Sequence, residues 1–484
     1  MRQILTFMSA LAASAVLAGG LSSSALAAPQ VADLLIRSAN VIDVKTGQVT
    51  PGQTVVVRGD DIIAVTADAE AAQTYAAART YDAAGRYVMP GLWDNHVHFG
   101  GAGLEDENAD LFPLYVANGV VAVRDAAGDL AQTVLDWRAT RPRPIGPRLF
   151  TSGPKIEGIA PVWKGVIEVG SEADVDAALD RLQGLKVDFV KITDSTLKPE
   201  LFLYAVRQAK ARGIKTSGHI PMGITVLEAA EAGLSTIEHL SYLMKAGSRD
   251  EAAISADYLA GRYTYAEAMA QYAATFDPDT ARRVYRRLAE LGVMASPTQH
   301  GSSTLAWLDR DDHSHDQELA YIGPGIRGTY GWRVERAAAA TPEQVEARHR
   351  VEATTLRTLP LLREAGVRVL AGTDAGFLNA FNYPGFSLHD ELALYVANGL
   401  TPREALEASV INGPALMGVS DRYGAVAQGR AADLIVLDAN PLTDIAATRR
   451  INAVVRGGRL LDRAELDGLL ADIRARVQAH EAAK

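Results

Sequence analysis

Residues 87–101 read Tyr-Val-Met-Pro-Gly-Leu-Trp-Asp-Asn-His-Val-His-Phe-Gly-Gly. The stretch is a short apolar run that carries His96 and His98 at its end and stops at two glycines. On a β-strand, residues at positions i and i+2 point to the same side, so both imidazoles would project toward one point. Two converging imidazoles could chelate one metal ion, whereas unrelated histidines at a strand end are the ordinary alternative. The pair therefore predicts a metal site only if further ligands lie elsewhere in the chain.

Outward from this stretch, strand-like apolar runs alternate with helical patterns through the middle of the chain. With the run that holds His96 we count eight of them, the others being residues 119–125, 147–153, 187–192, 214–219, 236–239, 293–297 and 367–374. Several helical stretches end in a glycine directly before the next run, as at Gly213, Gly233 and Gly366. Eight such units predict an α/β fold, a (β/α)8 TIM-like barrel, over residues 87–420. An open doubly wound sheet is the alternative, but no Gly-x-Gly-x-x-Gly follows a first strand.

Both ends of the chain carry short strand-like runs separated by glycine turns. Residues 29–86 and 421–462 share this pattern and predict one small β-sandwich domain built from both termini. Residues 463–484 are rich in alanine and charge, which predicts a C-terminal helix. Two gaps in the barrel segment, residues 241–290 and 298–362, exceed what a β/α unit needs. We interpret them as helical insertions that cover the site, rather than as disordered loops.

The composition excludes several classes of function. The formal net charge is -10, so the chain has no basic surface typical of proteins that bind nucleic acid or anionic membranes. There is no cysteine, which excludes disulfides, thiolate zinc ligands and cysteine nucleophiles. Any metal site must then consist of histidines, carboxylates or a modified residue.

The N-terminus has the pattern of an export signal. Arg2 supplies a positive start, residues 4–17 are mainly apolar and uncharged, and Ser24-Ala25-Leu26-Ala27 gives a small-x-small cleavage pattern. The apolar run is short for a spanning helix, although an uncleaved membrane anchor is the alternative. We therefore expect residues 1–28 to be a signal peptide. The mature protein would be periplasmic or secreted, without membrane contact after cleavage.

Side chains that can bind metals follow the carboxyl ends of the predicted strands. They are His96, His98, Lys191, His219, His239 and Asp374. In a (β/α)8 barrel these strand ends converge, so residues distant in sequence meet around one centre.

Lys191 is unusual because it interrupts the apolar run Phe189-Val190-Lys191-Ile192. An unpaired ammonium inside a barrel is costly and is expected to lose its proton. A neutral amine can take up carbon dioxide to form a carbamate, an anionic ligand able to bridge two divalent cations. The alternative is an ordinary ion pair with Asp188 or Asp194. Beside the strand-end histidines and Asp374, we favour the carbamate.

The motifs together resemble the amidohydrolase superfamily, in particular its imidazolonepropionase-like members and the binuclear prolidase-type dipeptidases. The motifs that carry this resemblance are residues 88–98, 190–192, 218–219, 238–240 and 372–376, supported by 387–392, 398–406 and 429–434. The resemblance spans roughly residues 32–460. It implies a barrel with a small β-sandwich, two divalent ions of the zinc type, and hydrolysis by a hydroxide that bridges them.

The resemblance also implies which residues hold each ion. His96, His98 and Asp374 would bind the buried ion, and His219 and His239 would bind the outer ion.

Three further roles follow from the same resemblance. Carbamylated Lys191 would join the two ions. Asp374 would be catalytic, taking a proton from the hydroxide and passing it to the leaving amine. Tyr242 matches a tyrosine that, in the dipeptidase branch, helps to polarise the substrate carbonyl, although loop packing would also explain it.

The chain departs from the dipeptidase branch after the third strand. Members of that branch carry Gly-Gly-His-Gly there, whereas residues 153–165 contain no histidine, which puts dipeptides in doubt as the substrate. Lys164, Lys155 or Arg124 could hold a substrate carboxylate, although surface or core-rim positions would also explain them. His300, after the seventh strand, is a further candidate on the substrate side and an alternative proton carrier.

The leading hypothesis is an exported binuclear metal-dependent amidohydrolase that cleaves a small amide or peptide, such as a dipeptide or an N-acyl amino acid. Alternatives are a mononuclear cyclic-amide hydrolase or deaminase, a lactone or phosphotriester hydrolase, and a metal-free binding protein on the same fold. Deaminases of this kind carry a glutamate three residues after the fifth-strand histidine, whereas Met222 stands three after His219. A homo-oligomer is compatible with the sequence, which does not specify it.

The export signal gives a first prediction. Intact-mass measurement of the protein expressed in a Gram-negative host should show a chain that begins near Ala28, because signal peptidases cleave after small-x-small sequences. A full-length mass in the soluble periplasmic fraction would contradict the cleavage.

Overall fold

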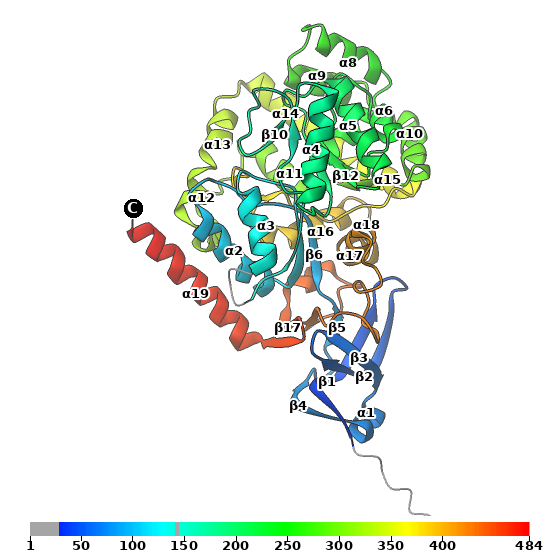
Figure 1. Cartoon of the computed structure of the whole chain (residues 1–484), viewed down its shortest axis with the longest axis vertical. Helices are drawn as coiled ribbons and strands as arrows, with labels where there is room; N and C mark the ends of the chain where they lie inside the picture. Colours follow the sequence, from blue (N-terminus) through cyan, green and yellow to red (C-terminus); the bar gives the residue numbers. More distant parts are fainter. Residues whose placement is uncertain (1–28, 141–144, 484) are drawn as a thin grey trace, which may run out of the picture.

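The computed structural model describes residues 29–140 and 145–483 of the chain. Figure 1 shows a large α/β body above a smaller β-rich part that contains the first strands. The expected signal peptide, residues 1–28, and Lys484 lie outside the described residues. Within the described ranges, no helix combines the length and apolar character needed to cross a membrane.

One mixed sheet, the terminal sheet, combines strands from both ends of the chain. Its strand order is β18-β17-β16-β5-β1-β2-β3, and β4 pairs in parallel with β1. Its buried valines, leucines and isoleucines form an apolar cluster of their own. The elements are β1 (Gln30–Asp43), β2 (Gln48–Arg58), β3 (Asp61–Ala67), α1 (Asp68–Thr74), β4 (Tyr75–Asp82), β5 (Tyr87–Pro90), β16 (Leu434–Leu437), η2 (Ile445–Arg449), β17 (Ile451–Arg456) and β18 (Arg459–Asp462).

The strand β5 belongs to the terminal sheet, although the sequence placed residues 87–90 at the start of the barrel segment. Val88 lies opposite Val41 of β1 and Val436 of β16, and these three buried side chains pack in one cluster. Gly91 then divides the apolar run, because a Cβ there would come within 2.4 Å of Val121. The first half of the run therefore pairs with the terminal sheet and only the second half enters the α/β body.

Two parallel sheets make up the α/β body. Their strand orders are β15-β6-β7-β8 and β10-β9-β11-β12-β13-β14. The strands are β6 (Leu92–His98), β7 (Val120–Asp125), β8 (Arg148–Thr151), β9 (Ile156–Glu157), β10 (Ile167–Glu168), β11 (Val190–Ile192), β12 (Thr216–Gly218), β13 (Thr236–Glu238), β14 (Met294–Ser296) and β15 (Ala375–Gly376). Helices between them are α2 (Glu105–Ala117), α3 (Ala131–Thr140), α4 (Glu172–Gly184), α5 (Pro199–Ala211) and α6 (Val226–Ala232). Helices that cover a parallel sheet explain why strands such as β7 are buried along their whole length.

Backbone hydrogen bonds join these two sheets on both sides. Asp188, just before β11, donates its N–H to Thr151 at the end of β8 at 2.9 Å. On the other side, Leu370 donates to Ala295 of β14 at 2.7 Å, and the carbonyl of Ala371 accepts from β6 at 2.8 Å. The run of parallel strands therefore returns to β6, where it began.

The eighth predicted strand, residues 367–374, is irregular in the structure. Only Val369 forms a β-bridge, and Ala371 donates its N–H to Ala408 of helix α17 (Pro402–Val410) instead of to a strand. Asp374 has a φ of 63°, which ends the extended conformation. The prediction of a full strand is therefore wrong, because a helix and a left-handed residue take up its backbone, yet the segment still places Asp374 beside β6.

The two long gaps between strands are helical. Many of their helices lie toward the end of the molecule opposite the terminal sheet (Figure 1), whereas the short helix Pro324–Gly328 packs against Glu105–Ala117 and the C-terminal helix. Thr264 and Thr341 begin two of these helices with reciprocal side-chain caps. The gaps contain α7 (Leu240–Ala246), α8 (Glu251–Leu259), α9 (Tyr265–Ala274), α10 (Pro278–Glu290), α11 (Gln299–Ala306), η1 (Gln317–Tyr321), α12 (Pro324–Gly328), α13 (Gly331–Ala338), α14 (Pro342–Leu356) and α15 (Thr358–Ala365). The chain ends with α16 (Phe386–Ala397), α17 (Pro402–Val410), α18 (Asn412–Met417) and α19 (Arg463–Ala482), which packs along α2.

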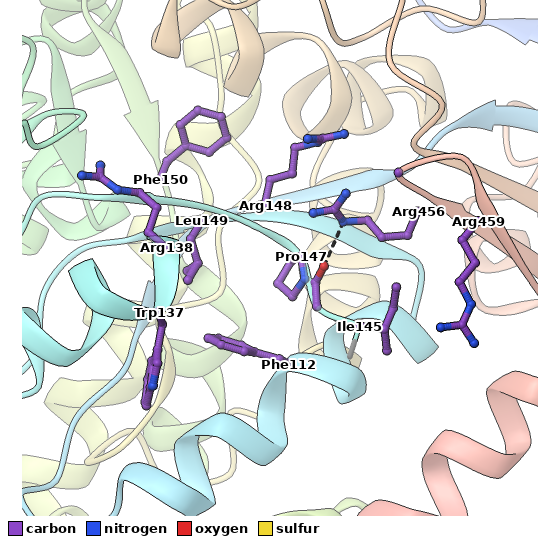
Figure 2. A pocket seen from close by; sticks show the side chains of 12 residues that line it. Phe112, Trp137, Arg138, Ile145, Pro147, Arg148, Leu149, Phe150, Arg456 and Arg459 are labelled. Carbon is purple, nitrogen blue, oxygen red and sulfur yellow. Dashed lines mark hydrogen bonds between the residues drawn. The ribbon is translucent and has the colours of Figure 1, made fainter. Parts of the chain in front are cut away.

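Asp433 is a buried anion at the junction between the terminal sheet and β8. Its carboxylate accepts from Arg148 Nε at 2.5 Å, from Arg456 Nη1 at 3.2 Å and from the Gly457 N–H at 2.7 Å. Arg148 and Arg456 also line a cavity of about 360 Å³ at this junction (Figure 2). Arg148 is the first residue of β8, so this cavity lies at the opposite end of the strands from the predicted metal ligands.

We expect Asp433→Ala to lower the free energy of unfolding by about 3–5 kcal/mol, because it removes a buried anion shared by the buried Arg456 and the partly exposed Arg148. The urea midpoint followed by circular dichroism measures this. Asp438→Ala is the matched control, since Asp438 pairs with Arg86 at a partly exposed site, and there the loss should stay below about 1 kcal/mol. Equal shifts for both variants would contradict the structural role of Asp433.

Candidate metal centre

The carboxyl ends of β6, β12 and β13, together with the residue before β15, supply five of the candidate ligands. His96 and His98 lie on β6, at alternating positions that face the same side. His219 follows β12 directly and His239 follows β13 directly, while Asp374 precedes β15. Because β15 pairs with β6, the aspartate and the first two histidines come together.

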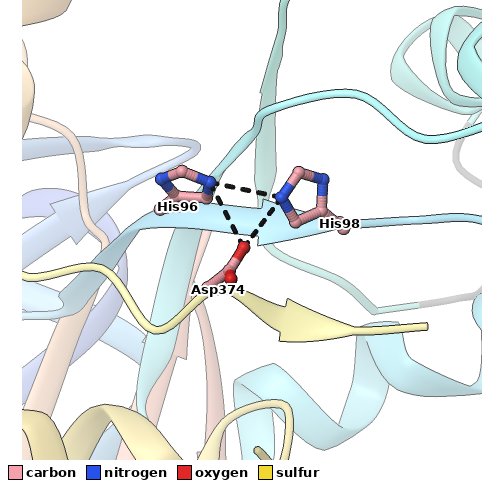
Figure 3. Close-up of side chains that lie close together, drawn as sticks. All are labelled: His96, His98 and Asp374. Carbon is pink, nitrogen blue, oxygen red and sulfur yellow. Dashed lines mark hydrogen bonds and ion pairs between the residues drawn. The ribbon is translucent and has the colours of Figure 1, made fainter. Parts of the chain in front are cut away.

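His96, His98 and Asp374 form a compact group whose ligand atoms lie within 4.8 Å of one another (Figure 3). The two Nε2 atoms are 3.2 Å apart. Asp374 Oδ1 lies 2.9 Å from Nε2 of His98 and 3.4 Å from Nε2 of His96. Two imidazoles and one carboxylate at this spacing form a possible metal site.

Hydrogen bonds on the far side of each ring determine which nitrogen faces the group. His96 Nδ1 lies 2.6 Å from Glu238 Oε2, and His98 Nδ1 is hydrogen-bonded to the carbonyl of Ala127. Carboxylate and carbonyl oxygens only accept, so both Nδ1 atoms carry the hydrogen and both Nε2 atoms present lone pairs. Lone pairs that face each other and the Asp374 carboxylate require a cation between them. The donor set therefore fits a metal ion.

His219 and His239 form a second pair of imidazoles with a similarly short contact. Their Nε2 atoms are 2.8 Å apart. His239 Nδ1 lies 2.7 Å from Oγ1 of Thr298, whose hydroxyl donates to the carbonyl of Pro297 and can only accept from the ring. The rings of His96 and His239 are 5.4 Å apart between centroids. The two pairs therefore lie side by side, and the second also presents a lone pair that fits a cation.

Burial keeps His96, His219 and His239 neutral. Desolvation, with the nearby Lys191 charge, lowers the pKa of His96 to about 3. Desolvation lowers the pKa of His239 to about 4 and that of His219 well below its ordinary value. Neutral imidazole is the form that binds metals.

Lys191 lies inside the same region without a partner. It is fully buried on β11, beside Ser217 of β12 in the parallel pairing. Among the described residues, its Nζ has no hydrogen-bond partner. Burial lowers the pKa of this amine to about 8, so a neutral amine is accessible near physiological pH, as the predicted carbamate would require.

Glu238 is the hydrogen-bond partner of His96 Nδ1, and Glu238 itself accepts several buried hydrogen bonds. Arg124 Nη2 donates to both Glu238 oxygens at 2.9 and 3.0 Å, and its Nε donates to the carbonyl of Asn95 at 2.5 Å. Ser217 and Thr236 donate to Oε1 at 2.5 Å. Burial opposes ionisation of Glu238, but Arg124 and His96 hold its pKa well below the ordinary value.

The prediction that Arg124 contacts substrate is therefore corrected. Arg124 is 1% exposed, and its guanidinium lies 4.9 Å from the ring centroid of Phe189. Its hydrogen bonds are directed at Glu238 and the backbone of β6, because an arginine on the inner face of β7 points into the sheet interior. It orients a histidine rather than binding a substrate.

Strained backbone marks the residues that follow the strands. His239, Thr298 and Asp374 have φ values of 70°, 48° and 63°. Such left-handed conformations cost roughly 1–3 kcal/mol each for non-glycine residues and cluster at functional sites. At His239 the unusual φ also ends the alternation of β13, which lets Glu238 and His239 both reach the centre from successive positions.

Tyr242 lies near the second histidine pair. Its hydroxyl donates to Asp194 Oδ2 at 3.1 Å, and its ring stacks at 6.2 Å on His219. Asp194 Oδ1 is 3.7 Å from Nδ1 of His219. Burial, with Glu157 nearby, raises the pKa of Asp194 to about 6. This tyrosine is therefore placed at the edge of the group, as a substrate contact would need.

The two remaining predicted substrate residues lie in different places. Lys164 is exposed and lines a cavity together with Lys155. His300 is the second residue of α11, and its backbone N–H donates to Glu391. Within the described part of the chain, no contact joins the His300 ring to the histidines of the centre. The structure thus brings the six predicted ligands to the same strand ends but leaves His300 outside the group.

Glu238 and Thr298 were missed by the sequence analysis. Glu238 had a usable signal, because a carboxylate within the buried strand β13 is as unusual as Lys191 within β11. Thr298 had none, since a threonine after a strand is common and only its distance to His239 reveals its role.

The comparisons with known proteins agree with this site. Residues 87–461 match the model of the amidohydrolase family. An imidazolonepropionase from Deinococcus deserti is 26% identical over 403 residues, which cover 80% of this chain and 86% of the relative. An ochratoxinase from Aspergillus niger is 23% identical over 436 residues, covering 77% of this chain and 75% of the relative.

Among solved structures, a bottromycin amidohydrolase superposes with a TM-score of 0.69 at 23% identity, covering 92% of this chain and 90% of that chain. This likeness shows a shared fold. The family match spans most of the chain and confirms the resemblance inferred from the motifs. The protein therefore belongs to the amidohydrolase family.

Proposed function

We propose that this protein is an exported, binuclear metal-dependent hydrolase that cleaves an amide or peptide bond in a small molecule. Its membership of the amidohydrolase family makes it a hydrolase of carbon–nitrogen bonds. The observation that carries the proposal of two metals is the pair of close contacts between Nε2 atoms, His96 with His98 and His219 with His239, at 3.2 and 2.8 Å.

Each contact would accommodate one ion. His96, His98 and Asp374 would hold the first, and His219 and His239 would hold the second. Lys191, as a carbamate, would supply an anionic oxygen to both. Imidazole and carboxylate donors of this number suit zinc, which we propose as the native ion.

The residues of this chain would then divide the work of hydrolysis. Two bound divalent ions supply an acidified water and polarise the scissile carbonyl. The Asp374 carboxylate takes a proton from the attacking water and returns it to the leaving nitrogen. Burial acts to raise the pKa of Asp374, but the contact with His98 and the neighbouring histidines lower it, so the carboxylate is ionised and able to accept a proton. The Tyr242 hydroxyl would contact the substrate carbonyl.

The mononuclear alternative has less support. Met222 occupies the position where the deaminases carry a glutamate, and it packs in an apolar cluster with Met244 and Ile254. A mononuclear site would also give the buried Lys191 no second ion to bridge. Elemental analysis of the purified protein distinguishes the hypotheses. We expect two metal ions per chain for the binuclear enzyme, whereas a mononuclear enzyme would give one and a metal-free protein none.

We also propose that the two parallel sheets form one (β/α)8 barrel and that the terminal sheet forms the β-sandwich domain. The site would face the periplasm or the medium after export, and the substrate would be a small molecule rather than a nucleic acid or a membrane.

The lysine carbamate gives one prediction. Lys191→Ala should lose the second metal ion and most of the activity, because its oxygens would be shared by both ions. Short-chain carboxylic acids such as formate should restore part of both, since they can occupy the vacated space. Metal content by elemental analysis and turnover of a small amide measure the two effects.

Lys245→Ala is the matched control, because Lys245 is equally buried but already bonds to the carbonyl of Ile224 and to Glu251. It should lower stability without changing the metal count, and formate should not restore it. Two metals and near-normal turnover in Lys191→Ala without additives would refute the bridging role.

The proton carrier gives another prediction. Asp374→Asn should lower kcat by about 10²–10⁴, the usual contribution of general acid–base catalysis. Metal content should fall only modestly, because four imidazoles and the carbamate remain, and KM should stay near its original value. The low-pH limb of the rate profile should change with kcat.

Asp390→Asn is the control, since it removes a carboxylate that pairs with Arg449 away from the group. It should leave kcat within a few-fold of the parent. If Asp374→Asn binds two metals and also stays within a few-fold, another group carries the proton, and His300→Ala becomes the next variant to measure.

A further inference from the structure

A cavity of about 390 Å³ opens beside the His98 side of the metal centre. Its walls include Val162, Trp163, Trp332, Phe377 and Leu378, with Lys155 among them. Val162 is 75% exposed and Trp332 is 39% exposed, so the apolar wall continues to the surface. Uncovered apolar side chains at a cavity mouth are typical of a binding site for an apolar group.

The cavity is adjacent to the candidate ligands along the chain. Gly128 lines it, and the preceding carbonyl of Ala127 is the hydrogen-bond partner of His98. A Cβ at Gly128 would lie 2.0 Å from the carbonyl oxygen of Phe99 and 2.9 Å from the Phe377 ring. Only glycine therefore allows this close packing, which holds the cavity wall against the strand that carries His98.

Lys155 brings a buried cation to this cavity. It is 8% exposed, and its Nζ lies 4.7 Å from the centroid of the Trp163 ring. Among the contacts of the described residues, that ring is the only partner of its ammonium, which has no hydrogen bond and no carboxylate at ion-pair distance. Burial lowers the pKa of Lys155 to about 8, although the carboxylates of Glu157 and Asp374 act to raise it. An ammonium this buried needs an anion.

The acids that act on Lys155 are already engaged elsewhere: Asp125 accepts from the Thr151 hydroxyl, and Asp374 contacts His98. Asp129, also in the cavity wall, accepts the N–H groups of Gly101 and Ala102 at 2.5 and 3.2 Å. Glu157 accepts from the backbone and hydroxyl of Ser195 and from further N–H groups of the same loop. The anion that pairs with Lys155 must therefore come from outside this set.

We propose that Lys155 binds a carboxylate of the substrate while the cavity walls hold an apolar side chain, so that the enzyme hydrolyses N-acyl derivatives of apolar or aromatic amino acids. This inference rests on the proposed amide hydrolysis at the adjacent centre. A single carboxylate fits better than a phosphate, because one buried ammonium faces the cavity and Asp129 contributes a negative charge to its wall. Trp163 positions the ammonium through a cation–π contact.

A pair of substrates that differ only in the carboxylate tests the proposal with the full-length, metal-loaded protein. N-acetyl-L-phenylalanine contains the carboxylate, and N-acetyl-2-phenylethylamine has the same amide and ring without it. The wild type should prefer the acid by about 10- to 100-fold in kcat/KM, the range expected of one charge-assisted hydrogen bond in a buried site.

Lys155→Met should reduce kcat/KM for the acid by a similar factor and leave the rate for the neutral amide within about threefold. Lys155→Arg should keep part of the preference, because it keeps the charge. Lys215→Met is the control, since Lys215 is an exposed lysine before β12, at the opposite end of that strand from His219. Metal content should be the same in all four proteins.

A binding measurement separates this inference from the proposed function. Calorimetric titration with 3-phenylpropanoate should show binding to the wild type that weakens at least tenfold in Lys155→Met, while 3-phenylpropanol binds weakly to both. If no amide is hydrolysed but this difference appears, the proposed function fails and the carboxylate site stands. If Lys155→Met binds 3-phenylpropanoate as tightly as the wild type, or if the wild type does not prefer the acid, the carboxylate site is refuted.

Discussion

The contact between imidazole nitrogens is the constraint on which the centre depends. In each pair, two Nε2 atoms lie about as close as hydrogen-bonded atoms, at 3.2 and 2.8 Å. For three of the four rings the other nitrogen is bonded to an atom that can only accept, so the facing nitrogens of these three rings, when neutral, hold lone pairs. Between His96 and His98 such an arrangement is repulsive unless a cation lies between the rings. The strained φ angles at His239 and Asp374 follow from the same need to direct these side chains inward.

Three buried cations surround the centre, and their surroundings give them different roles. Arg124 is neutralised by Glu238 and thereby fixes the orientation of His96. Lys191 has no hydrogen-bond partner among the described residues, which favours its chemical modification. Lys155 lies against an aromatic ring at a cavity. Burial disfavours the charge of both lysines, so the availability of an anion, rather than the residue type, decides what each can do.

The position of the centre relative to the rest of the chain also has a physical basis. Parallel strands bring their carboxyl ends to one face, where backbone can leave the ladder without losing sheet hydrogen bonds. The terminal sheet is joined to the opposite end of β8 through Asp433 and its arginines. The contacts that stabilise the junction with the terminal sheet and the candidate metal ligands therefore lie at opposite ends of the parallel strands.

The sequence by itself predicted the candidate ligands, since the histidines and Asp374 follow apolar runs, and Lys191 interrupts one, at a spacing that matches β/α units. It also indicated the helical gaps and the shared sheet of the two termini, because alternation and glycine turns are local signals. Only the tertiary structure decided that Arg124 faces Glu238, that residues 367–374 are irregular, and that β5 joins the terminal sheet. Each outcome depends on a contact between residues distant in sequence. Arg124 meets Glu238, Ala371 meets Ala408, and Val88 of β5 meets Val436. A sequence pattern gives the face of a strand but not the partner opposite it.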